Sequence, residues 1–164
     1  MRGWDYCIPE RVAITMLTDS DCFVCRKHRG EEPIPGGPIY SDGLLFASHA
    51  MTPDAEKTYL GWCILEPVRH VAGLDGLTDA EAEAFGRLAA RLSRALKEEL
   101  QAEHIYAFVL GHHVPHLHLH LLARYPGTPR EYWGVNIDEW PAAPKGNEGE
   151  IAALVGRLKK RLSA

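Results

Sequence analysis

The chain has 164 residues, of which 46% are hydrophobic and 24% are charged, and its formal net charge at pH 7 is −4. These values are those of a soluble globular protein with one ordinary core. The acidic balance argues against broad binding to nucleic acids or membranes, and no stretch is long and apolar enough to predict a membrane-spanning helix. Residues 1–10 lack the apolar run of a secretion signal, so we expect a cytoplasmic protein with reduced thiols.

Two cysteines, Cys22 and Cys25, follow an N-terminal stretch, residues 1–18, that we interpret as an extension. In a reducing compartment the spacing Cys-x-x-Cys is typical of half a zinc site or of a redox pair. A redox pair would be expected within a thioredoxin-like βαβ pattern, which is not found around these residues. Tetrahedral zinc needs two further ligands, and His28 is a candidate. The alternative is that both cysteines are buried and unpaired.

The next elements predict the first part of a sheet. Asp42-Gly43 separates two strand-like pieces, as in a hairpin. Residues 48–59 are polar, contain a proline and are interpreted as a connection. Residues 61–67 predict a buried strand that ends at Pro67.

A long helix and a second group of strands follow. A capping box, Thr78 to Glu81, opens a helix that extends to about Gln101 with an apolar face at three- and four-residue steps. Strands are expected over residues 105–110 and 116–123, and an amphipathic helix ends the chain. Strands, helix, strands and helix with hairpin-like connections predict an α+β domain around an antiparallel sheet.

The most informative stretch is residues 116–122, His-Leu-His-Leu-His-Leu-Leu. Alternate side chains of a strand point to opposite faces, so three imidazoles should line one face. Leu117, Leu119 and Leu121 should be buried on the other face. Such histidines suit a metal site, or nucleophilic and acid–base chemistry near neutral pH, or they simply form a polar strand face.

This stretch resembles the signature of the histidine-triad (HIT) family of nucleotide hydrolases and transferases, His-φ-His-φ-His-φ-φ with φ apolar, at all seven positions. The similarity extends over roughly residues 20–125. It implies an HIT-like fold with an antiparallel sheet of about five strands, a long helix and a C-terminal helix. We expect one domain over residues 1–164, in which residues 126–164 form a C-terminal extension.

The resemblance implies a catalytic role for His118, supported by His116 and His120. The middle histidine of the family attacks the α-phosphorus of a nucleotide conjugate, such as a dinucleoside polyphosphate or a phosphoramidate, and forms a covalent nucleotidyl-histidine. Water or another acceptor then releases the nucleotide, so the implied activity is that of a hydrolase or a transferase. Family members commonly form homodimers, and we expect one here.

The zinc-bearing branch of the family implies a structural zinc site. Its four ligands correspond to Cys22, Cys25, His70 and His116 of this sequence. Such a Cys₂His₂ set leaves no coordination position open, so the metal would stabilise the fold and would not activate water.

Two substrate-binding segments depart from the family pattern. The segment containing Phe46 and Ser48 lacks the carboxylate that usually holds the ribose hydroxyls, and His112 and His113 stand where glutamine and serine are common. We expect these four residues to contact substrate. Two other functions remain open: a non-catalytic zinc-containing nucleotide-binding or interaction module, and a metal-dependent hydrolase or oxygenase that uses the three triad histidines as ligands.

Overall fold

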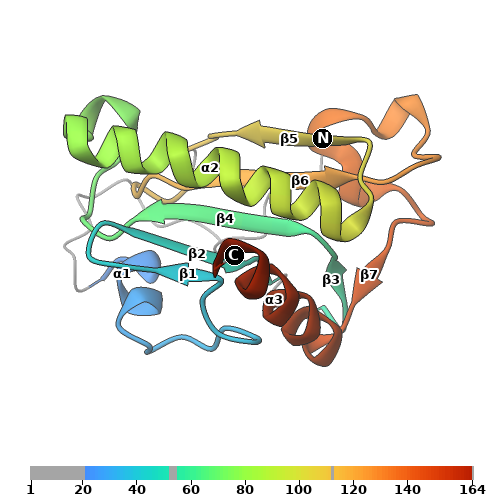
Figure 1. Cartoon of the computed structure of the whole chain (residues 1–164), viewed down its shortest axis with the longest axis horizontal. Helices are drawn as coiled ribbons and strands as arrows, with labels where there is room; N and C mark the ends of the chain where they lie inside the picture. Colours follow the sequence, from blue (N-terminus) through green and yellow to red (C-terminus); the bar gives the residue numbers. More distant parts are fainter. Residues whose placement is uncertain (1–20, 52–54, 112, 164) are drawn as a thin grey trace.

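The computed structural model describes residues 21–51, 55–111 and 113–163. In this part of the chain, helices pack on a five-stranded antiparallel sheet, as the sequence predicts (Figure 1). The sheet has the order β1-β2-β4-β6-β5, with β1 (Tyr40–Ser41), β2 (Leu45–His49), β4 (Trp62–Pro67), β5 (His104–Phe108) and β6 (Leu119–Arg124). The α-helices are α1 (Phe23–His28), α2 (Asp79–Leu100) and α3 (Glu148–Ser163). Short 3₁₀ turns lie at Leu74–Gly76, Arg130–Tyr132 and Gly134–Glu139.

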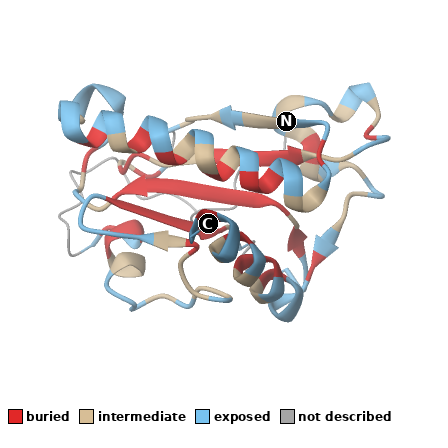
Figure 2. Cartoon of the chain, viewed as in Figure 1, coloured by how far each residue is buried: buried red, intermediate tan, exposed pale blue. Residues whose placement is uncertain are grey.

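One face of the sheet is covered by α2 and α3. Leu65 and Leu121 point to this face and pack with Leu92 of α2 and Leu158 of α3 in one core cluster. Figure 2 shows β4 buried along its length and α2 buried only on the side that meets the sheet. Complete burial of one such leucine contributes roughly 1.5–3 kcal/mol. The C-terminal helix therefore shares the core of the family-like region.

The expected capping box of α2 is present. The Thr78 hydroxyl accepts from the Glu81 backbone N–H, and the Glu81 carboxylate accepts from the Thr78 backbone N–H. The helix ends at Leu100, and its C-cap residue, Gln101, adopts a left-handed conformation with φ of 51°. At the start of α3, Asn147 and Glu150 exchange the same pair of hydrogen bonds. Helix α2 thus begins where the sequence predicts, and α3 begins with the same kind of cap.

A second, two-stranded sheet was not expected. It pairs β3 (Thr58–Tyr59) with β7 (Lys145–Gly146), and Tyr59 is buried in a cluster with Trp62 and Ile137 on the other face of the main sheet. The interpretation of residues 48–59 as a connection is therefore wrong at both ends, because residues 48 and 49 belong to β2. Strands of two residues have no periodicity that a sequence could display.

The triad strand begins later than expected. Strand β6 starts at Leu119, whose partner is Leu65, and the ladder stops there because Pro67 has no N–H with which to continue it. The preceding segment is held by the Leu117 N–H, which donates to the Val71 carbonyl at 2.6 Å. Leu117 and Leu121 are buried as expected, whereas Leu119 is only half-buried.

The described helices include none that combines the length and the apolar character needed to cross a membrane.

Candidate functional site

In each triad histidine, one ring nitrogen is hydrogen-bonded to a group that can only accept or can only donate. His116 Nε2 lies 2.9 Å from the Pro67 carbonyl oxygen, and His118 Nδ1 lies 2.6 Å from the His116 carbonyl oxygen. A carbonyl only accepts, so both of these nitrogens carry a hydrogen. The indole Nε1–H of Trp62 only donates, and it lies 3.0 Å from His120 Nδ1, which must therefore be the acceptor.

These contacts define three different functional nitrogens. In the neutral rings, His116 keeps a lone pair on Nδ1 and His118 keeps one on Nε2. His120, like His116, has its hydrogen on Nε2, but its Nδ1 lone pair is taken by the Trp62 indole and its Nε2–H is the donor. The same short segment thus presents a nitrogen of His116 that can ligate a metal, a nitrogen of His118 that can act as a nucleophile, and an N–H of His120 that can donate.

The ligand nitrogen of His116 belongs to a buried cluster with Cys22, Cys25 and His70, the four residues that the family resemblance implies. Their ligand atoms all lie within 4.8 Å of one another. His116 Nδ1 is 3.5 Å from each cysteine sulfur, and His70 Nδ1 is 3.4 Å from Cys25 Sγ. In a zinc tetrahedron with bonds of about 2.0–2.3 Å, neighbouring ligand atoms are about 3.3–3.8 Å apart. The donor set and its spacing therefore fit zinc.

The hydrogen bonding around this cluster also fits a metal site. The hydrogen bond from His116 Nε2 to Pro67 orients the ring so that Nδ1 faces the two thiols, which is the usual arrangement for a metal-ligating histidine. His28, the rival ligand, is not part of the cluster. Its Nε2 lies 3.1 Å from Glu66 Oε2.

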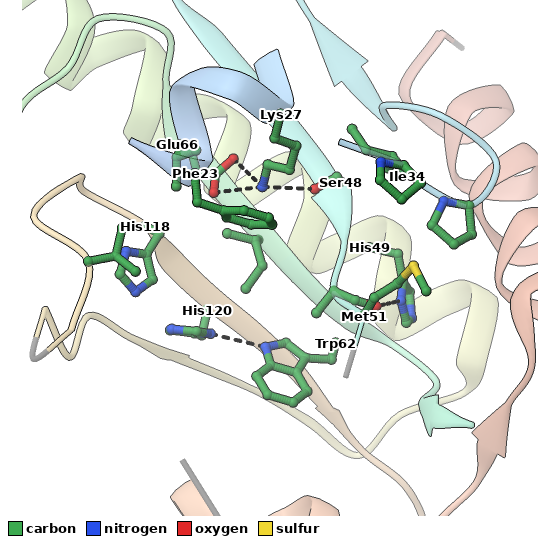
Figure 3. A pocket seen from close by; sticks show the side chains of 16 residues that line it. Phe23, Lys27, Ile34, Ser48, His49, Met51, Trp62, Glu66, His118 and His120 are labelled. Atoms are coloured by element: carbon green, nitrogen blue, oxygen red, sulfur yellow. Dashed lines mark hydrogen bonds and ion pairs between the residues drawn. The ribbon is translucent and has the colours of Figure 1, made fainter. Parts of the chain in front are cut away.

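A pocket opens on the other side of the triad, beside His118 and His120 (Figure 3). Side chains from α1, from the loop after it, from β2 and from β4 form its walls. Its apolar lining is Phe23, Val24, Pro33, Ile34, Pro35, Ala50, Met51, Trp62, Ile64 and Val114, and its polar lining is Lys27, Ser48, His49, Glu66, His118 and His120. Phe23 and Met51 are among the exposed large hydrophobic residues. An apolar slot with a few polar groups suits a small organic ligand.

His120 is held as a neutral imidazole at the floor of this pocket. Burial lowers its pKa, with a further contribution from the neighbouring His118, to about 3. The Phe108 ring is stacked on it at a centroid distance of 5.3 Å, and the His118 ring meets it edge-on at 5.0 Å. At neutral pH His120 is therefore an N–H donor and not a cation.

The pocket wall opposite His120 contains a buried ion pair between Lys27 of α1 and Glu66 of β4. Lys27 Nζ lies 2.8 Å from Glu66 Oε1 and 2.7 Å from Oε2. Burial on its own would raise the pKa of Glu66, but the Lys27 charge and the His28 hydrogen bond outweigh it and bring the pKa to about 2. Glu66 is therefore a carboxylate whose two oxygens are already occupied.

Of the three described residues that were expected to bind substrate, one lines the pocket and two do not. Ser48 lines the pocket. Phe46 lies behind it, with its ring 4.5 Å from the His28 ring and with Lys27 over its face at 5.8 Å. His113 is exposed and is not among the pocket-lining residues, and His112 lies outside the described residues.

Sequence reasoning missed Lys27, His49 and Glu66 of the polar lining, and also Trp62, whose indole N–H fixes His120. A signal existed for Glu66, which is the one charged residue in the strand sequence Trp-Cys-Ile-Leu-Glu-Pro. A carboxylate in a strand buried on both faces requires a partner. No sequence signal identified Lys27 as that partner, because the two residues are 39 positions apart.

A model of the HIT domain family matches residues 31–127, which is more than half of the chain. No curated protein sequence matches at a significant level. A Zn-bound histidine triad family protein from Mycobacterium smegmatis is 19% identical, with a TM-score of 0.65 over 89% of this chain and 98% of that one. A hypothetical histidine triad nucleotide-binding protein from Sulfolobus tokodaii is 17% identical, with a TM-score of 0.65 over 87% and 92%. A histidine triad protein from Bradyrhizobium japonicum is 25% identical, with a TM-score of 0.59 over 82% and 93%.

The described residues have an α+β fold of the histidine-triad type. The chain belongs to the HIT domain family. Members of this family are generally nucleotide hydrolases or transferases, and some are non-catalytic.

Proposed function

We propose that this protein is an enzyme that cleaves nucleotide conjugates at the α-phosphorus through a covalent intermediate on His118. The observation that carries the proposal is the hydrogen bond from His118 Nδ1 to the His116 carbonyl. It leaves the Nε2 lone pair of a pocket-lining histidine available to attack. Imidazole is a good nucleophile near neutral pH.

In the first step His118 Nε2 forms a bond to the α-phosphorus, and the bond to the leaving group breaks with its electron pair. The carbonyl that accepts from Nδ1–H stabilises the positive charge that forms on the ring. In the second step water attacks the same phosphorus and gives up a proton to solvent, which balances the proton taken up by the departed leaving group. The P–N bond breaks and the imidazole regains its lone pair. The Nε2–H of His120 is placed to donate to a phosphoryl oxygen on which negative charge develops.

The metal that fits the cysteine–histidine cluster would be held by Cys22, Cys25, His70 and His116. Four protein ligands fill a tetrahedral zinc, so its contribution would be structural. It would fix α1 against the start of the triad segment, and both of these line the pocket.

Mass spectrometry of the protein after incubation with adenosine 5′-phosphoramidate or a dinucleoside polyphosphate tests the proposal. We expect an adduct one nucleoside monophosphate heavier on His118, together with free monophosphate as product. The His118→Ala variant should form neither. Turnover of either substrate by that variant would contradict the mechanism.

The absence of a carboxylate on β2 favours a second candidate, a nucleotide-binding module without turnover. Leu45–His49 contains no acidic residue, and Glu66 on the adjacent strand is already bonded to Lys27 and His28. The same experiment separates the two candidates, since the module would bind nucleotide and give neither adduct nor product.

We further propose that the protein is a cytoplasmic homodimer. Strand β5 is at the edge of the main sheet, paired only with β6 within the described residues, and it leaves a row of backbone groups for another chain. Light scattering at micromolar concentration should report twice the mass of the chain. A monomer at that concentration would reject the dimer.

A further inference from the structure

One side chain of the pocket has a donor that the protein does not use fully. Lys27 has three N–H groups, and two suffice for the Glu66 oxygens at 2.7 and 2.8 Å. The third is directed at Ser48 Oγ, 3.5 Å away, at the long limit for a hydrogen bond. The side chain of Lys27 is 11% exposed, so this donor faces the pocket and not bulk water.

The position of Lys27 decides which part of a nucleotide it meets. If the reacting phosphorus lies at His118, the nucleoside must extend into the rest of the pocket. Figure 3 shows His118 on one side, Ile34 and Met51 on the other, and Lys27 and Ser48 along the wall between them. Glu66 and His49, the other polar residues of this part of the lining, already have hydrogen-bond partners on their side-chain atoms. A base placed there would therefore find its polar partners in Lys27 and Ser48.

The net charge of the Lys27–Glu66 pair further restricts which chemical group of a nucleotide could bind beside it. Glu66 is ionised and is 1% exposed, so the Lys27–Glu66 pair is neutral as a whole. A second phosphate beside this pair would face a buried carboxylate with no net positive charge to offset it. A neutral acceptor such as a base carbonyl could take the Lys27 hydrogen without that cost. An amino group of a base could not pair with Lys27, because both groups are hydrogen-bond donors. The buried Lys27 donor would then be left without an acceptor.

We propose that Lys27, held by Glu66 and Ser48, is a specificity-determining residue that selects nucleotides whose base presents a carbonyl oxygen to the pocket wall. This inference rests on the proposed function, because it places the substrate's phosphorus at His118. Glu66 acts through Lys27 as a positioning residue. The pair thereby supplies polar recognition in a pocket that lacks a carboxylate on β2.

Inosine and adenosine nucleotides test the proposal, since at one ring position hypoxanthine has a carbonyl oxygen where adenine has an amino group, while the adjacent ring nitrogen is an N–H donor in hypoxanthine and an acceptor in adenine. Calorimetric titration of the full-length protein should show IMP bound roughly tenfold more tightly than AMP, the effect of one hydrogen bond to a charged donor. The ratio of kcat/KM for the two phosphoramidates should follow the same order. Equal affinity for IMP and AMP, or binding of neither, would overturn the inference.

The decisive variant is Lys27→Met combined with Glu66→Gln, which removes the ammonium without leaving an unpaired buried carboxylate. It should bind IMP and AMP with affinities within about twofold of each other and keep its metal content. Lys97→Met, an exposed lysine of α2, is the matched control and should keep the preference. A preference for IMP that persists in the double variant would show that Lys27 does not determine which base is bound.

Two further results distinguish this proposal from a ribose contact and from the proposed enzymatic function. One result is that 2′-deoxy-IMP binds to the parent no more tightly than AMP, while the double variant binds 2′-deoxy-IMP and IMP equally. In that case Lys27 contacts the ribose, and the base assignment is overturned. If IMP is preferred but neither phosphoramidate is cleaved, the inference stands and the proposed enzymatic function fails.

Discussion

The metal cluster and the pocket are built from histidines two residues apart, and they differ in which ring nitrogen is tied to the backbone. His116 gives Nε2 to the Pro67 carbonyl and turns Nδ1 to the cysteines. His118 gives Nδ1 to the His116 carbonyl and leaves Nε2 for the pocket. One backbone acceptor for each ring thus decides whether the histidine belongs to the metal-cluster half or to the pocket half of the site.

The two halves also differ in their partners. The cluster is made of four residues of ligand type, all buried or half-buried. The pocket mixes apolar side chains with a few polar groups whose directions are fixed by neutral or ionic partners, such as Trp62 for His120 and Glu66 for Lys27. Changes in the first half should therefore affect stability and metal content, and changes in the second half should affect chemistry.

His118→Ala should have the largest effect on chemistry and none on the metal. Loss of a covalent nucleophile typically lowers kcat by several orders of magnitude, roughly 10⁴-fold or more. Measured zinc content and the unfolding midpoint should be unchanged. His104→Ala, which removes an exposed histidine of β5, serves as the control and should retain activity. Loss of metal in the His118 variant would break the division between the two halves.

Cys22→Ser should have the opposite pattern. The metal content should fall to near zero and the free energy of unfolding should drop by several kcal/mol, because binding at a closed Cys₂His₂ site contributes directly to folding. Cys63→Ala is the matched control, since Cys63 is a buried core cysteine outside the cluster. His28→Ala should also keep its zinc. Full zinc occupancy in the His70→Ala or His116→Ala variant would show that the ligand set is wrong.

Trp62→Phe sharpens the comparison within the pocket. The substitution keeps an aromatic ring but removes the N–H that fixes His120, so kcat should fall about 10- to 100-fold with little change in metal content. Nitrogen NMR should show a mixture of His120 tautomers in the variant and a single Nε2–H form in the parent. Trp133→Phe is the control, because the Trp133 indole donates to Thr128 far from the triad. An unchanged His120 spectrum would contradict the assignment.

The smallest effect is expected at Glu81, outside both halves. Its pKa is lowered to about 2, first by the Arg69 hydrogen bond and then by the backbone N–H of Thr78. The folded state therefore favours the carboxylate, and this stability is present above about pH 4.5 and lost as the pH falls toward 2. Glu81→Gln should flatten the acid dependence of the unfolding free energy in that window. Exposed Glu83→Gln should leave the dependence as it is.

Much of the fold follows from short-range signals. The capping box of α2, the apolar periodicity of both long helices and the hairpin at Asp42-Gly43 each predict an element that the structure contains. The four ligand residues follow from the family resemblance, and they lie together. What sequence reasoning missed is the set of pairings between short or distant segments, such as β3 with β7 and Lys27 with Glu66. No local pattern encodes these pairings, because they depend on how the sheet brings distant positions together.

The start of the triad strand illustrates the same limit. Alternation of histidine and leucine indicates extended backbone from His116 onward, and it correctly predicts the burial of Leu117 and Leu121 but not that of Leu119, which is half-buried. It does not reveal that the ladder stops at Leu119, because the cause is Pro67 on the neighbouring strand. Which nitrogen of each imidazole is available is likewise set by distant partners.

Helix α1 contributes to both halves of the site with only six residues. Cys25 faces the metal cluster, while Phe23 and Lys27 form part of the pocket wall. Isolated helices shorter than about 12–15 residues are marginal in water, so α1 depends on its contacts for its order. An ion in the cluster and a nucleotide in the pocket would stabilise the same conformation of this helix. Their binding is therefore expected to be cooperative, with each ligand raising the affinity of the other by the same factor.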